Sequence, residues 1–142
     1  MRNIPCQIVS GIFFTALGVR PVYGRELTVA DEMHASDVLP AVLGYSFWSR
    51  NYAGDPGAVG RRFILQNRVF TIVGVMPREF HGVQLESGPD VYLPLAAAEG
   101  LFDNPEINSY RKLGYTLVAR LRRGVKLAAA RAEAESIFKA AR

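Results

Sequence analysis

Residues 54–77 read GDPGAVGRRFILQNRVFTIVGVMP, and this stretch decides the fold of the chain. Its opening turn residues lead into two β-rich runs, 61–65 and 69–76, which are separated by a short polar tip at 66–68. Two such runs with so short a connection are antiparallel neighbours, and Asn67 tolerates the positive φ that a tight tip needs. The stretch therefore predicts a β-hairpin.

The side-chain pattern of this hairpin is typical of a scaffold. In the first run, Phe63 and Leu65 fall on one face of the strand, while Arg62 and Ile64 fall on the other. Asp55 precedes a proline, and such a pair commonly opens a turn, which we favour over a catalytic carboxylate. The hairpin therefore leaves little room for a catalytic site.

Short strands and short helices are predicted on both sides of the hairpin. Strands are expected at 4–10, 38–43, 89–95 and 115–121, and helices or helical turns at 11–17, 46–52 and 127–141. Ser46 is expected to cap its helix, and Pro40 predicts that its strand lies at a sheet edge or begins after the proline. The fold class predicted is α+β, with mostly antiparallel strands and short interrupting helices.

The last helix, 127–141, has the strongest helical pattern in the chain. Its apolar side chains recur at helical spacing, which predicts one face that packs against other elements. These side chains are those of Leu127, Ala130, Ala134, Ile137, Phe138 and Ala141.

Composition indicates a globular chain. Its 142 residues, 49% apolar and 21% charged, suit one domain or two small lobes. A single cysteine, Cys6, excludes an intrachain disulfide, and its strand-like surroundings predict a small buried side chain. No apolar run reaches the roughly 20 residues that a membrane-spanning helix needs.

Charge is distributed unevenly along the chain. Residues 1–110 hold eight Lys or Arg and eleven Asp or Glu, whereas residues 111–142 hold nine and two. A basic segment of this kind can bind nucleic acid or another anionic surface. No aromatic residue interleaves with its cluster of Arg120, Arg122, Arg123 and Lys126, so we favour a solvated polar face.

Candidate catalytic residues are few. His34 and His81 lie in separate loops without an acidic partner at a metal-like spacing, and His81 is expected to orient its loop by hydrogen bonding. Ser10 lacks the glycine two residues before it that a nucleophile elbow requires. The sequence therefore predicts no enzyme, and we assign no catalytic, cofactor-binding or metal-ligating residue.

Two arginines directly follow glycines and are candidates for fixing loops. Arg25 follows Gly24, and Arg61 follows Gly60. Ion pairs of these cations with Asp31, Asp55 or Asp90 would hold their loops, although an exposed pair contributes only ~0–1 kcal/mol.

Several segments, taken in order, resemble a known domain family. They are VSGIFFTALGVRPVYGR (9–25), VLGYSFWSR (42–50), GDPGAVGR (54–61) and FTIVGVMP (70–77), followed by PDVYLPL (89–95) and ARLRRGV (119–125). Together they resemble the periplasmic core domain of MacB/FtsX-type ABC transporter permeases. The resemblance covers about residues 8–140.

This resemblance implies an extracytoplasmic domain of an inner-membrane protein, inserted between the first two transmembrane helices of a permease. Such a domain has no catalytic activity of its own, because a separate cytoplasmic ATPase hydrolyses ATP. It relays conformational change and contacts substrates or partner proteins during export. The implied partners are the membrane portion of the permease, the ATPase and a periplasmic adaptor, with a homodimeric parent and no nucleic acid.

The resemblance also implies two structural parts. Residues 4–37 and 110–142 would form a porter-like α/β part that is incomplete at its N-terminus, and residues 38–109 a smaller β-rich lobe. Nine residues are expected to carry structural roles rather than chemistry. These are Gly11, Phe14, Gly18, Arg25, Trp48, Asp55, Gly60, Gly74 and Pro77.

The sequence departs from the family in some places. Ile12 stands where the family often has asparagine, and residues 66–68 replace a commoner Leu-Asn-Gly tip. The transmembrane helices are absent from this sequence, so we expect a domain, a fragment or a truncated product. The alternatives to the permease domain are a basic-surface binding module for anionic partners and a fragment without independent function.

Overall fold

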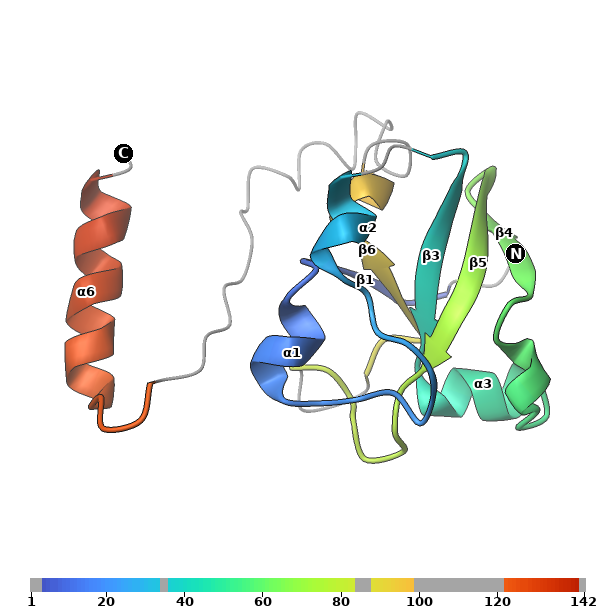
Figure 1. The fold of residues 1–142 in the computed structure, drawn as a ribbon, viewed down its shortest axis with the longest axis horizontal. Helices are drawn as coiled ribbons and strands as arrows, with labels where there is room; N and C mark the ends of the chain where they lie inside the picture. The colour runs from blue at the N-terminus through green and yellow to red at the C-terminus, as the bar shows by residue number, and fades with distance from the viewer. Residues whose placement is uncertain (1–3, 34–35, 84–87, 99–121, 141–142) are drawn as a thin grey trace.

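Six strands and a few short helices make up the computed structural model, which describes residues 4–33, 36–83, 88–98 and 122–140 (Figure 1). The strands are β1 (Cys6–Val9), β2 (Tyr23–Gly24), β3 (Val38–Leu43), β4 (Arg62–Leu65), β5 (Arg68–Val75) and β6 (Val91–Pro94). The helices are α1 (Phe13–Leu17), α2 (Val29–Met33), α3 (Tyr45–Asn51) and α6 (Leu127–Ala140), with 3₁₀ turns η1 (Pro56–Ala58) and η2 (Leu95–Ala97).

All six strands join one mixed sheet. Its order is β1-β6-β3-β5-β2, and β4 also pairs with β5. Three of the five pairings are antiparallel, whereas β1 with β6 and β3 with β5 are parallel. The α+β fold class, with mostly antiparallel strands and short helices, is therefore confirmed.

The hairpin predicted from residues 54–77 is present as β4 and β5. Its tip contains two residues, because Leu65 already pairs with Arg68. Gln66 and Asn67 have φ values of 51° and 63°, and two positive values in succession are typical of the type I′ turn that suits the twist of a hairpin. Ile64 points to solvent and is 72% exposed, as its place opposite the apolar face predicts.

Side chains point alternately to the two faces of the sheet along each strand, and this divides the core into two clusters. Leu43 and Leu93 belong to one buried cluster, which also holds Trp48 from α3 and Phe70 from β5. Their neighbours point the other way, and Tyr92 joins the second cluster. The remaining buried members of the second cluster are Val9, Phe14, Leu27, Val42 and Met76. Both faces are covered, so the sheet forms a two-sided scaffold.

The position of Pro40 corrects an expectation. β3 begins at Val38, before the proline, and lies between β5 and β6 rather than at an edge. The sheet tolerates Pro40 because β6 pairs with β3 only at Val42 and Leu43. At Pro40 the strand has β5 on one side alone, so the missing N–H interrupts no ladder on the other side.

The helix ends are set by glycines. Gly18 ends α1 with a φ of 71°, and its N–H and that of Val19 donate to carbonyls of the last turn. The sequence led us to expect that Ser46 caps α3, and this expectation is wrong. The helix begins one residue earlier, and its N-cap is Gly44 in extended conformation, with no side-chain cap bond.

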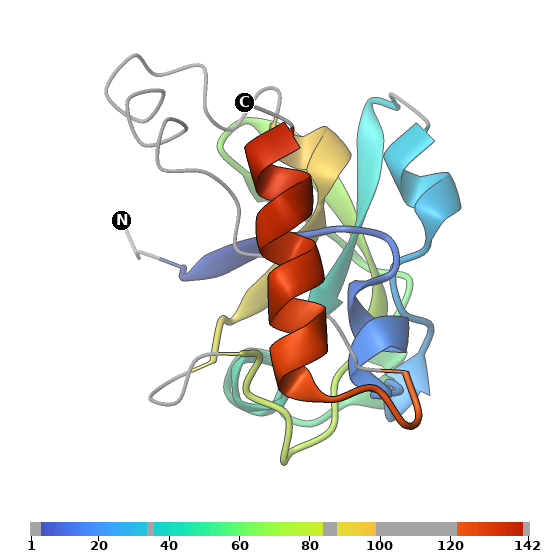
Figure 2. The same cartoon turned by 90° about the vertical axis from the view of Figure 1, so that its left-hand side faces the viewer.

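The helix predicted at the C-terminal end is confirmed as α6, from Leu127 to Ala140. It stands to one side of the sheet in Figure 1, and it lies in front of the sheet in Figure 2, which is seen from that side. Leu127 and Ile137 are each 61% exposed, so these members of its expected apolar face do not pack against the sheet. No helix in the described part of the chain is both long and apolar enough to cross a membrane.

Some expectations lie outside the described residues. The predicted strand at 115–121 is among them, and so are Ala141 and His34. Strands from 4–37 and from 38–109 join the same sheet, and the division into a porter-like part and a β-rich lobe stays a prediction.

Candidate functional site

A groove opens at one end of the sheet, between the start of α3 and residues 78–81 and 88–90, which precede β6. Its volume is about 450 Å³. Its ionisable side chains are those of Arg50, Arg78, His81 and Asp90, and aromatic side chains from Phe47 and Phe80 lie beside them. These residues come from three separate segments, which the fold brings together.

The backbone fixes the shape of this groove. The Gly44 N–H donates to the Asp90 carbonyl oxygen at 2.8 Å. A Cβ on Gly44 would lie 2.7 Å from the Pro89 carbonyl oxygen, and one on Gly88 would lie 2.7 Å from the His81 Cα. Because contacts that short do not occur, both positions need glycine, and the segments forming the walls are in direct backbone contact.

The groove has more cations than anions. Arg50 Nη2 lies 3.7 Å from Asp90 Oδ1, which is a long ion pair, and the Arg50 side chain is 69% exposed. Arg78 is exposed and has no hydrogen bond or ion pair within the described residues. His81 is also exposed, and its side chain makes no hydrogen bond in that same part of the chain. The described lining therefore holds two guanidinium groups and one carboxylate.

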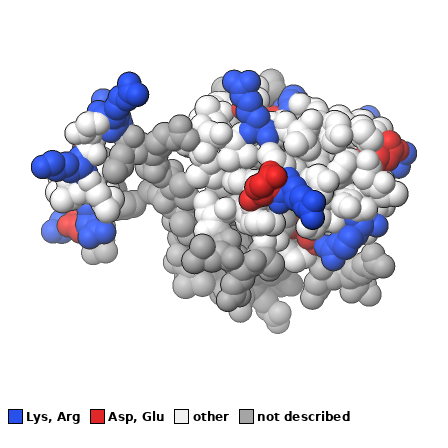
Figure 3. All heavy atoms as spheres, turned by 90° about the horizontal axis from the view of Figure 1, so that it is seen from below, with Lys and Arg blue, Asp and Glu red and all other residues white. Residues whose placement is uncertain are grey.

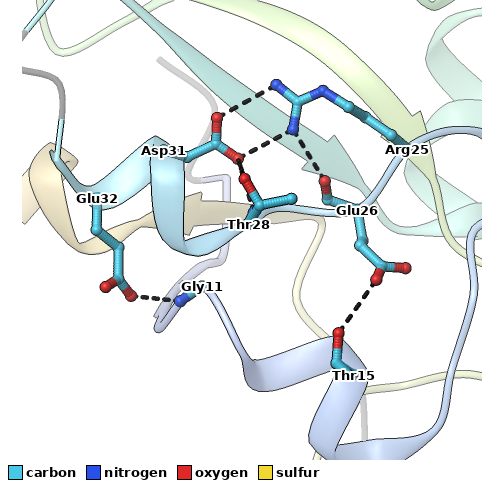
Figure 4. A network of polar contacts seen from close by, with 7 residues as sticks. All are labelled: Gly11, Thr15, Arg25, Glu26, Thr28, Asp31 and Glu32. Carbon is cyan, nitrogen blue, oxygen red and sulfur yellow. Dashed lines mark hydrogen bonds and ion pairs between the residues drawn. The ribbon is translucent and has the colours of Figure 1, made fainter.

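A polar network holds the segment before α2 (Figure 4). Arg25 Nη1 and Nη2 donate to the two carboxylate oxygens of Asp31 at 3.0 and 3.2 Å, and the Thr28 N–H donates to the same carboxylate at 2.7 Å. Partial burial acts to raise the pKa of Asp31, but these hydrogen bonds and the Arg25 charge outweigh it and lower that pKa below its usual value. The expected pairing of Arg25 with Asp31 is present.

The same network reaches α1. Glu32 accepts a hydrogen bond from the Gly11 N–H, and Thr15 Oγ1 donates to Glu26 Oε1 at 3.2 Å. Figure 4 shows both contacts joining α1 to the segment that contains α2. These bonds fix the position of α1 over the sheet.

A separate group of polar contacts surrounds Trp48 and Asp55. The Trp48 indole Nε1 donates to the Asp55 carbonyl oxygen at 2.9 Å. The Asp55 side chain accepts from the Gly57 N–H at 2.8 Å and pairs with Arg61 at 3.2 Å. Asp55 therefore opens a turn, as predicted, and the expected ion pair with Arg61 is present.

The other residues singled out from the sequence lie in several places. Gly11 and Phe14 lie at α1, and Phe14 is fully buried. Gly60 has a φ of 98° and leads into β4, and Pro77 follows β5. A Cβ on Gly74 would overlap the Arg25 carbonyl oxygen, so this position needs glycine. The structure does not gather the nine residues into one site, and their functional weight stays a prediction.

Cys6 differs from the expectation of a buried side chain. The residue is exposed, and its sulfur donates to the Ile4 carbonyl oxygen at 3.3 Å. Partial removal of that sulfur from water, together with the nearby Asp90 charge, raises the pKa of the Cys6 thiol to about 11. Among the described residues no group of three or more His, Cys, Asp or Glu could hold a metal ion.

Basic side chains form separate spots rather than one continuous patch on the face shown in Figure 3. Arg122, Arg123 and Lys126 are exposed at the start of α6. Arg120, the fourth member of the cluster noted in the sequence, lies outside the described residues.

Comparison with known families decides the relationship. The sequence model of the MacB-like periplasmic core domain matches residues 3–137. The chain belongs to this family. The resemblance of its segments to the core domain of MacB/FtsX-type ABC transporter permeases is thereby confirmed.

A solved structure shares the fold of this MacB-like core domain. It is the periplasmic region of MacB from Actinobacillus actinomycetemcomitans, with a TM-score of 0.63 and 17% sequence identity. The alignment covers 95% of the present chain and 55% of that one, so the chain spans about half the length of this relative. The sequence matches none of the curated proteins with which it was compared.

Sequence reasoning missed the groove of this MacB-like domain. Asp90 was a candidate for pairing with Arg25 or Arg61, yet its partner is Arg50. Nothing near Arg78 in the sequence marks a site. The glycines Gly44 and Gly88 are the signal that could have pointed here, since each stands where two chain segments meet.

Proposed function

We propose that this chain is a non-catalytic extracytoplasmic domain of an ABC transporter permease, which transmits conformational change and contacts substrate or partner proteins during export. The observation that carries the proposal is the match of the MacB-like periplasmic core domain over residues 3–137. The domain would lie in the periplasm as part of an inner-membrane protein.

The architecture supports a mechanical role. A two-sided core packs every strand of the sheet except the two-residue β2, whose residues are exposed, and polar contacts fix α1, α2 and the turn at Asp55. Packed elements of this kind move as units rather than deforming continuously. The lobe of residues 4–98 is therefore suited to pass on a displacement, with α6 as a separate element beside it.

The partners follow from the same proposal. The parent permease would supply the membrane portion, a cytoplasmic ATPase would supply the energy, and a periplasmic adaptor is a further candidate. The parent would act as a homodimer. Catalysis would belong to the ATPase, and the carboxylates of Asp31 and Asp55 serve here in ion pairs and turn caps.

A spin-label experiment in the complete permease tests the transmission of movement. With Cys6→Ser as background, labels at Ile64→Cys on β4 and Ala132→Cys on α6 report the distance between lobe and helix. Both positions are exposed, so labels there disturb no packing. We expect the distance distribution to shift when the ATPase is trapped with nucleotide.

A matched pair within the lobe serves as control. Labels at Ile64→Cys and Ser49→Cys, both exposed, join two elements of the packed lobe, so their distance should not change with nucleotide. An unchanged distance for the lobe-to-helix pair in the trapped state would contradict transmission through this domain.

A further inference from the structure

We propose that the groove between α3 and residues 78–81 and 88–90 binds an acidic segment of a partner protein, whose carboxylates are taken by Arg50 and Arg78. This inference rests on the proposed function, and it names the chemistry of one partner contact. The occupant is an extended peptide that carries acidic residues beside apolar ones.

The shape of the groove is built into the fold. Its walls are held by the hydrogen bond from Gly44 to Asp90 and by the direct backbone contacts at Gly44 and Gly88. The β6 end of the groove is anchored too, because the Asp90 N–H donates to the Pro5 carbonyl oxygen at 2.8 Å. A ligand would therefore meet a preformed surface and would lose little free energy to ordering it.

The charges of the groove call for an anion. Asp90 can neutralise only one cation. Arg50 Nε donates to the Ser46 carbonyl oxygen at 3.3 Å, and the 3.7 Å distance from Nη2 to Asp90 leaves that end of the guanidinium able to take a better acceptor. Arg78 has no acceptor within the described residues. A carboxylate entering here would gain charge-assisted hydrogen bonds from guanidinium groups, which bind carboxylates in bidentate geometry.

Size and lining favour a peptide over a small ion. A volume of about 450 Å³ is many times that of one water molecule, whose share of the liquid is ~30 Å³. The half-buried side chains of Tyr45, Phe47 and Phe80 lie beside the arginines and offer apolar surface to the residues flanking the carboxylate. A free phosphate would leave that surface unused, and a bilayer is too broad to enter a groove.

Fluorescence anisotropy with the 142-residue chain tests the proposal. The probe is a fluorescein-labelled peptide, Gly-Glu-Phe-Glu-Leu-Gly, and the matched probe replaces both Glu by Gln. We expect saturable binding of the acidic probe alone. Arg78→Gln should weaken it about tenfold, since a charge-assisted hydrogen bond is lost. Arg50→Gln combined with Arg78→Gln should abolish binding.

The matched control variant is Arg62→Gln. Arg62 is an exposed arginine on β4, outside the groove, and it has no ion pair within the described residues, so its loss should leave binding unchanged. Thermal unfolding followed by circular dichroism should show that Arg78→Gln folds like the wild type, because Arg78 is exposed and makes no ion pair among the residues that the structure describes.

Several outcomes would overturn the proposal. No binding of the acidic probe up to about 1 mM would do so, as would equal binding of the Gln probe. Displacement of the probe by an equal concentration of inorganic phosphate would indicate a free-anion site. Arg78-dependent binding to phosphatidylglycerol vesicles, without peptide binding, would indicate a lipid surface. None of these results bears on the nucleotide-dependent label distances, so the proposed function would stand or fall separately.

Discussion

At the scale of single residues, Tyr92 has a closely packed ring and a buried hydroxyl without a hydrogen-bond partner among the described residues. The residue is fully buried, and its ring lies 5.2 Å from that of Phe14 and 5.8 Å from that of Phe80. Its hydroxyl has no hydrogen-bond partner within the described residues. Burial also raises the pKa of Tyr92, so the hydroxyl stays protonated and its oxygen–hydrogen dipole remains unmatched in the core.

Replacing Tyr92 with phenylalanine should therefore stabilise the domain. Tyr92→Phe keeps the ring contacts and removes a buried donor, so we expect the free energy of unfolding to rise by about 1 kcal/mol. Urea denaturation measures this change.

Two further variants serve as comparisons for Tyr92→Phe. Tyr92→Ala removes the ring as well and should cost about 3–5 kcal/mol. Tyr45→Phe removes a hydroxyl from a half-buried residue and should change the free energy by less than about 0.5 kcal/mol. A loss of stability in Tyr92→Phe would show that the hydroxyl has a partner that the described residues do not supply.

At the scale of elements, the helices α1, α2 and α3 are too short to be stable by themselves. Helix α2 has five residues, and its start depends on Asp31, which accepts from the Thr28 N–H and Oγ1. An acidic side chain in the first turn that bonds the N-cap backbone forms half of a capping box. The ion pair with Arg25 then ties this helix start to the end of β2.

Loss of the Asp31 carboxylate should weaken this element in a pH-dependent manner. We expect Asp31→Asn to lower the free energy of unfolding by about 1 kcal/mol at pH 7. Because the folded-state pKa of Asp31 lies below its usual 3.8, its contribution is complete above that value and is lost as pH falls through the folded pKa.

Urea denaturation of the wild type and of Asp31→Asn at several pH values between neutrality and strong acid checks the sign. The difference between the two proteins should be largest near neutrality and should shrink in acid, where the wild-type carboxyl is also protonated. A difference that grew on acidification would mean that the folded state raises the pKa. Thr28→Val, which keeps the backbone N–H, should cost less than Asp31→Asn.

At the scale of the whole molecule, α6 is set apart from the rest. The described strands and both clusters lie within residues 4–98, and α6 stands apart from them in Figure 1. Its exposed Leu127 and Ile137 contribute nothing to either cluster. The stability of the isolated chain should therefore come from the sheet and not from this helix.

Paired substitutions test this division. Leu127→Gln with Ile137→Gln should change the free energy of unfolding by less than about 0.5 kcal/mol per residue, because both side chains are already in water. Leu43→Ala, in the core on β3, should cost about 2–5 kcal/mol. Urea denaturation with tryptophan fluorescence follows both, since Trp48 lies in the Leu43 cluster. A large loss from the helix substitutions would mean that α6 packs against the lobe in solution.

Local sequence signals determined the hairpin, the turn at Asp55 and the helix at the C-terminal end. Each depends on residues close together in the chain, such as the two runs around Asn67. The resemblance of ordered segments also determined the family. By contrast, the prediction that Ser46 caps α3 was wrong. Ser46 is a good capping residue, but the helix start is set by the backbone contact of Gly44 with Pro89.

Only the tertiary structure decided the strand order, the central place of β3 despite Pro40, and the groove. The parallel pairing of β3 with β5 joins segments about thirty residues apart, and no local pattern specifies which strand lies beside which. Arg50 lies in a different segment of the chain from Arg78 and Asp90, so each alone looks like an ordinary surface residue. Periodicity encodes which face of an element is apolar, whereas the partner that covers that face is chosen by packing across the whole chain.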